Sequence, residues 1–176
     1  KITTTGTPPD EHTVTDSRVF NHSYSKTWKA VVDSLGASFF TLENIEKDSG
    51  ILSLSFAAQS PGEYIDCGTV RDHGTIVFAK HDHSFPGTAN NVERKLTSDA
   101  GQLVNVLRTT SLSGKCNVLV QSLGANKTRV SIKTRYIFTL RNQPYWAGIP
   151  AFENTMHFTG PEIGRFTDAP GGLTCR

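Results

Sequence analysis

The sequence predicts an α+β fold in which one main helix packs across a mostly antiparallel β-sheet. Apolar residues at helical spacing form one stripe of segment 24–36, an alternating run at 51–56 follows a turn, and three strand-like runs fill 102–140. The first pattern is typical of an amphipathic helix, and the others are typical of half-buried antiparallel strands. The expected element order is β-α-β-β followed by a three-stranded meander.

The chain of 176 residues is long enough for one domain with a substantial core. Residues 1–16 are rich in Thr and Pro and contain little that could be buried, so we expect a flexible leader or tether. Residues 17–141 are expected to form a single domain with an irregular insertion at about 58–100. Residues 142–176, rich in Pro and Gly, are expected to form an irregular wrap.

The expected helix and hairpin form the centre of this domain. The apolar stripe of the helix consists of Tyr24, Trp28, Val31, Val32 and Leu35. Ser23 or Ser25 can cap its start, and Gly36 is expected to end it. A short strand at 19–20 precedes the helix, and the runs 39–42 and 51–56 are expected to pair across a turn at 47–50. Trp28 should be the largest anchor of the helix on the sheet.

The three later strands are expected at 102–112, 116–123 and 128–140, separated by Ser113-Gly114 and by residues 124–126. Alternation in the last strand places Arg129, Lys133 and Arg135 together on its solvent face. Segment 94–141 holds nine basic residues and one acidic residue, so these three side chains are a candidate surface for an anionic partner.

The alternative interpretation of this basic segment is that it pairs with the acidic hairpin residues Glu43, Glu46 and Asp48. Tyr136 and Phe138 fall on the opposite, buried face of the same strand. Because bases stack on exposed aromatic rings, this placement argues against nucleic-acid binding.

Cys67, Cys116 and Cys175 lie far apart and form no CxxC pair, which argues against a zinc or thioredoxin-like site. A long-range disulfide is expected if the protein is exported. The chain-entropy model assigns about 4–5 kcal/mol to a bridge closing either the 67–175 or the 67–116 loop, so energetics do not choose between them. The positions of the cysteines favour a disulfide between Cys67, which lies in a polar loop, and Cys175, which lies in the tail. Cys116 begins a strand and is then expected to be a buried free thiol. Three reduced cysteines in a cytosolic protein are the alternative.

His81 and His83 are the weak candidates for a metal site. An H-x-H pair in an extended segment directs both imidazoles to one side, which suits zinc, copper or nickel. Histidines in polar loops are usually solvated, so no metal and no other cofactor is expected. The sequence holds no nucleophile elbow, phosphate loop, metalloprotease helix or dinucleotide fingerprint, which predicts a protein that is not an enzyme. A hydrolase with a dispersed site is the least favoured alternative.

Several strings of the chain occur in a characteristic order. They are Tyr24-Ser25-Lys26-Thr27-Trp28, Asp48-Ser49-Gly50-Ile51-Leu52, Tyr64-Ile65-Asp66-Cys67-Gly68, Thr128-Arg129-Val130 and Thr174-Cys175-Arg176. This order resembles small bacterial outer-membrane lipoproteins with a BamC-like, helix-grip domain, over about residues 18–141 and the end of the chain.

The resemblance implies a periplasm-facing or surface domain that is tethered to the bacterial outer membrane by a lipid anchor upstream of Lys1. It implies a noncatalytic scaffold or accessory component whose partner is an envelope protein or further copies of the chain. The alternative function is a module that binds a lipid or other small apolar ligand between helix and sheet.

Overall fold

A computed structural model describes the chain except residues 12, 99, 147–148, 161 and 167–171. Strands make up 60% of the described residues and helical segments 10%, so the predicted α+β, helix-grip-like fold is wrong and the protein is mostly β. The two helical segments are α1 (Tyr24–Gly36) and a single 3₁₀ turn, η1 (Pro61–Glu63). No helix in the described part of the chain is long and apolar enough to cross a membrane.

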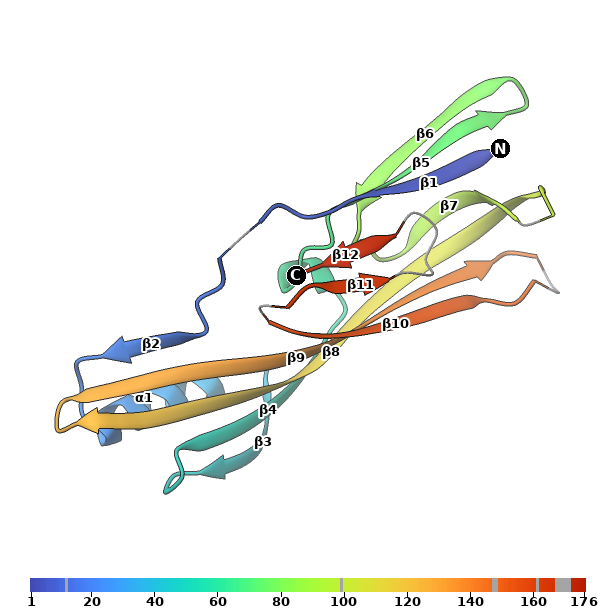
Figure 1. The fold of residues 1–176 in the computed structure, drawn as a ribbon. Coiled ribbons are helices and arrows are strands. Elements are labelled where there is room, and N and C mark those ends of the chain that lie inside the picture. The colour runs from blue at the N-terminus through green and yellow to red at the C-terminus, as the bar shows by residue number, and fades with distance from the viewer. Residues whose placement is uncertain (12, 99, 147–148, 161, 167–171) are drawn as a thin grey trace.

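A long antiparallel hairpin runs through the whole molecule, formed by β8 (Leu103–Gly124) and β9 (Lys127–Pro144) (Figure 1). Burial alternates along β8 from Val104 to Val120, so one face of the hairpin is covered and the other faces solvent. The prediction of two separate strands divided at Ser113-Gly114 is wrong. Gly114 lies within β8, and a Cβ there would stand 2.7 Å from the Phe56 ring, so close packing explains this glycine rather than a turn.

At one end of the hairpin, α1 covers the sheet. Here β2 (Ser17–Phe20) pairs with β9, while β3 (Thr41–Glu46) and β4 (Ile51–Ala58) extend the sheet from β8. The predicted helix is confirmed, with its last residue at Gly36; Ser23 occupies the N-cap position, but its side chain makes no capping hydrogen bond. The buried residues of this core are Trp28, Leu52, Leu54, Cys116, Val118 and Val120.

At the other end, a separate three-stranded sheet of β1 (Ile2–Thr7), β5 (Thr69–Ile76) and β6 (Ala79–Pro86) lies beside the main one (Figure 1). The main sheet gains β7 (Val92–Thr97) and β10 (Phe152–Thr159), and a small sheet forms from β11 (Gly164–Phe166) and β12 (Leu173–Cys175). The second core gathers buried residues from β5, β6 and β8 to β12, including Val70, Phe85, Leu112, Phe138 and Phe158.

Three expectations therefore need correction. The expected flexible leader contains strand β1, the expected irregular insertion contains η1 and three strands, and the expected wrap contains three strands. The physical reason is visible in β5 and β7, where the buried positions Asp72 and Arg94 carry charges instead of aliphatic side chains. Their burial depends on partners from other strands, which a local hydrophobic pattern does not reveal.

A buried ionic cluster joins the two sheets at this end. Both oxygens of the Asp72 carboxylate accept hydrogen bonds from Arg94, at 2.6 and 2.8 Å, and Oδ1 also accepts one from the Thr4 hydroxyl at 2.7 Å. Burial would raise the pKa of Asp72, but the hydrogen bonds from Arg94 and Thr4 outweigh it and hold that pKa below its usual value. The carboxylate is therefore ionised and fixes β1, β5 and β7 together.

Arg108 is a second buried guanidinium beside this pair. Burial, and next the positive charge of Arg94, lower its pKa to about 9. It donates a hydrogen bond to the Gly87 carbonyl, and its Nε has no partner among the described residues. Both guanidinium groups lie over the Phe85 ring, with their Cζ atoms 5.2 Å (Arg94) and 5.4 Å (Arg108) from the ring centroid. The cluster thus holds two cations and one carboxylate.

Candidate functional site

An open groove with a mainly apolar lining runs along one flank of α1. It encloses about 380 Å³, and its floor is made by side chains of β8 and β9. The helix buries Val118 on β8 but covers β9 only in part, so Val130 is half-buried and Ile132 is 48% exposed. The apolar residues that line the groove are Phe20, Ala30, Val31, Leu35, Val118, Val130 and Ile132.

The helix sequence explains why this flank is open. Positions 26, 30 and 34 are four residues apart, so they fall on one side of the helix, next to the row formed by Thr27, Val31 and Leu35. The outer row contains the small residues Ala30 and Ser34, which leave space above β9. The larger anchor, Trp28, points into the core on the other side.

Polar side chains also line this mainly apolar groove, among them Thr27, His22 and Lys26. The Thr27 side chain is buried, and its hydroxyl has no hydrogen-bond partner among the described residues. A buried hydroxyl without a partner costs free energy that a bound ligand could recover. His22 and Lys26 line the rim near Thr27.

The rim is positively charged. On the helix, Lys29 pairs with Asp33 at 2.5 Å, whereas Lys26 makes no ion pair with any described residue. Arg18 is close by, since its guanidinium lies 5.5 Å from the ring of Phe20, which lines the groove. The site therefore combines an apolar floor with cations at its edge that form no ion pair with described residues, an arrangement suited to an apolar chain with an anionic head group.

The three basic residues predicted to form an anionic-partner surface lie elsewhere. Arg129, Lys133 and Arg135 are exposed on β9, at alternating positions that face away from α1. None of them forms an ion pair with a described residue, although the neighbouring Lys115 lies 3.5 Å from Glu43. Pairing between the basic segment and the acidic hairpin thus occurs at Lys115.

The weak metal candidates His81 and His83 occupy alternate positions on β6 and are both half-buried. The ring of His83 lies 5.2 Å from that of Phe85, and the neighbouring carboxylate of Asp72 is committed to Arg94. No group of three or more potential ligands that could hold a metal ion occurs in the described part of the chain.

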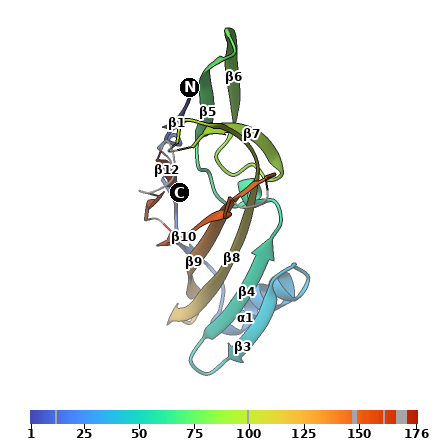
Figure 2. The same ribbon diagram turned by 90° about the vertical axis from the view of Figure 1, so that its right-hand side faces the viewer.

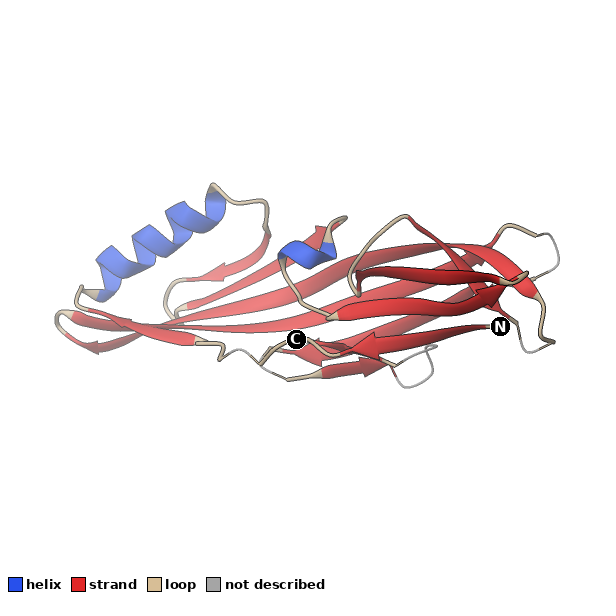
Figure 3. Cartoon of the chain, turned by 90° about the horizontal axis from the view of Figure 1, so that it is seen from above, coloured by secondary structure: helices blue, strands red, loops and turns tan. Residues whose placement is uncertain are grey.

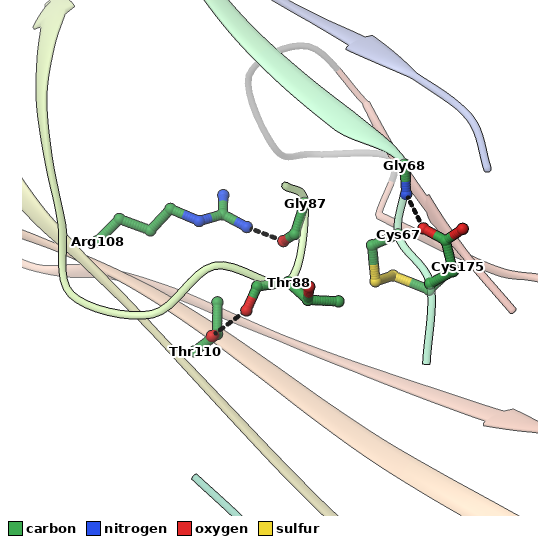
Figure 4. The surroundings of a disulfide bond; sticks show 8 residues. Cys67, Gly68, Gly87, Thr88, Arg108, Thr110 and Cys175 are labelled. Carbon is green, nitrogen blue, oxygen red and sulfur yellow. Dashed lines mark hydrogen bonds between the residues drawn. A yellow bond between two sulfur atoms is a disulfide. The ribbon is translucent and has the colours of Figure 1, made fainter. Parts of the chain in front are cut away.

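The disulfide joins Cys67 to Cys175, as position predicted, and Cys116 is a buried free thiol in β8. The tail also pairs with the loop beside Cys67, through two backbone hydrogen bonds between Asp66 and Arg176. Figure 4 shows how the loop after β6 connects this bridge to β8. Arg108 donates to the Gly87 carbonyl, and the Gly87 amide in turn donates to Gly68 at 2.7 Å.

The sequence predicted, as an alternative, a ligand site between helix and sheet, but it assigned Lys26 and Thr27 only to the helix and named no residue that lines the groove. The small residues Ala30 and Ser34, next to the apolar stripe, were the available signal. Comparison with protein-family models, with curated proteins and with solved structures gave no match, so the fold and the site are argued from this chain's own residues.

Proposed function

We propose that this chain is a noncatalytic binding domain that holds an acyl chain with an anionic head group in the groove beside α1. The observation that carries the proposal is the combination, in one site, of an apolar floor with a buried Thr27 hydroxyl and a rim Lys26 that have no polar partner among the residues that the structure describes. A volume of about 380 Å³ lies near the small end of the range for ligand sites, about 300–1,000 Å³. A medium-chain fatty acid is the simplest molecule with this chemistry.

We further propose that the domain works in the bacterial envelope, anchored to the outer membrane by a lipid upstream of Lys1. The Cys67–Cys175 disulfide supports an oxidising compartment, since such bridges are rare in the cytosol. The resemblance to BamC-like lipoproteins supports the anchor. Fractionation of cells that express the native gene tests this location, and recovery only in the cytosol would contradict it.

The binding test is a calorimetric titration with octanoate, decanoate and dodecanoate below their micelle concentrations. Each buried methylene contributes about 0.8 kcal/mol, so affinity should rise about fourfold per carbon until the groove is full, then level off. Native mass spectrometry of the protein as purified provides an independent search for a bound acyl ligand.

Two variants and a control place the ligand in the groove. Ile132→Glu introduces a charge on the floor and should abolish binding. Ile45→Glu is the matched control, because Ile45 on β3 is 46% exposed, close to the 48% of Ile132, and lies outside the groove. Lys26→Glu should weaken binding of dodecanoate and leave binding of dodecanol unchanged. The proposal fails if the wild-type protein binds none of these acids, or if both isoleucine variants lose binding equally.

A scaffold function is the second candidate, favoured by the exposed basic residues on the open face of β9. Arg129, Lys133 and Arg135 could contact an acidic patch on an envelope protein. Reversing all three charges to Glu should then abolish salt-sensitive crosslinking to that partner in envelope extracts. Unchanged crosslinking would remove this candidate without affecting the groove.

A further inference from the structure

The turn between β5 and β6 presents two large apolar side chains to solvent. Val77 is 86% exposed and Phe78 is 99% exposed. Both have left-handed backbone conformations, with φ of 44° and 69°. Figure 2 shows that this hairpin projects beyond the neighbouring strands.

Neither property stabilises the isolated protein. Positive φ is strained for a β-branched residue such as Val77, and two-residue hairpin turns of this kind favour Asn-Gly. A fully exposed phenyl ring gains nothing from burial in the folded chain. Strained, exposed apolar residues at a hairpin tip therefore point to a contact made outside this chain.

Two further turns bring apolar residues to the same end of the molecule. The β9–β10 connection carries Tyr145 and Trp146, which are 54% and 62% exposed, and Leu103 follows the β7–β8 turn. Strand pairing places these turns together. Ile2 pairs with Gly74 of β5, and its amide donates a hydrogen bond to the side-chain hydroxyl of Thr97 in β7. Thr97 in turn pairs with Leu103 of β8. The amide of Tyr145 donates a hydrogen bond to the carbonyl of Asn105, also in β8. Figure 1 shows the β5–β6 tip and the adjoining ends of β7, β8, β9 and β10 at the end of the hairpin away from α1.

The charges at this end are mainly positive. The exposed lysines Lys1, Lys80 and Lys95 form no ion pair with described residues, whereas the acidic groups that the structure describes nearby have partners. Asp82 pairs with Arg71, and Glu93 accepts a hydrogen bond from the Tyr145 hydroxyl at 3.0 Å.

We propose that these three turns dock onto the surface of an anionic lipid bilayer, with Phe78 and Trp146 entering the interface. Trp and Tyr are enriched at membrane interfaces, and lysines beside them attract anionic head groups. A bilayer also accepts several separate projections at once, because its surface deforms around each of them.

The test is co-sedimentation of the full chain with vesicles of phosphatidylcholine containing one quarter phosphatidylglycerol. The wild-type protein should bind, binding should fall with added salt or with pure phosphatidylcholine, and tryptophan emission should shift to shorter wavelength. Trp146→Phe should abolish this shift, since the other tryptophan, Trp28, is already buried.

The decisive variant is Val77→Asn/Phe78→Gly, which removes the apolar tip and installs the turn sequence that the backbone favours. It should fold at least as stably as the wild type and bind vesicles at least about tenfold more weakly. Ile45→Ser, at an exposed isoleucine remote from these turns, should bind like the wild type.

Two outcomes would overturn the proposal. One is vesicle binding by the Asn-Gly variant equal to that of the wild type. The other is a wild-type protein that does not bind vesicles but self-associates through the tip. Sedimentation velocity would then show a dimer for the wild type and a monomer for the Asn-Gly variant.

Discussion

Replacing Asp72 with Asn removes the only carboxylate of the buried cluster while nearly preserving its shape. Asp72 is fully buried, and the side chain of Arg94 is 2% exposed, so neither charge is compensated by solvent. The variant leaves Arg94 and Arg108 as two buried cations without a counter-ion. Breaking one partner of a buried pair typically costs about 3–5 kcal/mol.

That cost is large against the total stability of a domain, about 5–15 kcal/mol. Urea denaturation at pH 7, followed by far-ultraviolet circular dichroism, measures it. Asp82→Asn is the matched control, because Asp82 likewise pairs with an arginine, Arg71, but its side chain is 53% exposed. The loss of this exposed pair should lower stability by less than about 1 kcal/mol.

The pH dependence provides a second measure of the same pair. Because the pKa of Asp72 is lower in the folded than in the unfolded state, its contribution is complete above the usual aspartate value near 3.8 and is lost as pH falls through the folded pKa. The difference between wild type and Asp72→Asn should therefore shrink only in strong acid. Equal costs for Asp72→Asn and Asp82→Asn would refute the inference that burial makes this pair structural.

Two other predictions concern Arg108 and the disulfide. The pKa of Arg108 is about 9 in the folded protein, whereas an unfolded arginine keeps its proton to much higher pH. Between about pH 9 and 11 the unfolded state therefore binds one more proton than the folded state. The free energy of unfolding of the wild type should then rise by about 1.4 kcal/mol per pH unit relative to that of Arg108→Met. A flat or falling difference in urea titrations would show that this guanidinium is hydrated. Because the disulfide spans 108 residues, Cys67→Ala/Cys175→Ala should lower stability by about 4–5 kcal/mol. A reductant should lower the wild-type midpoint and leave that of the double variant unchanged, and equal midpoints without reductant would contradict the prediction.

The helix and the hairpin after it could be predicted because their signals are local. Trp28 and Leu35 lie on the same apolar stripe of α1, and alternation in β4 buries Leu52 and Leu54. The disulfide could also be predicted, since a polar loop and a tail are places where a bridge replaces missing core contacts. The inferences about the helix and the hairpin needed no knowledge of distant segments.

The other strands were hidden because their buried positions carry polar or charged side chains. Asp72 can be buried only because Arg94 of β7 pairs with its carboxylate. The sequence around Gly114 is typical of a turn, but the glycine is required there because Phe56 packs against it. The groove is equally nonlocal, because it depends on how far α1 covers β9 above Ile132. The pattern of side chains along a single strand does not reveal these contacts with other strands or with the helix.

The uninterrupted β8 strand sets a distance between the two proposed sites. With 22 residues at about 3.3 Å each, it spans at most about 70 Å. The groove lies at the α1 end, and the apolar turns lie at the opposite end (Figure 3). Because a continuously paired hairpin resists bending along its length, a molecule standing on a bilayer by its turns would carry the mouth of the groove tens of ångströms above the lipid. An acyl ligand would then have to leave the membrane completely to be bound, so the domain would act as a carrier or presenter of lipid rather than as an extractor at the surface.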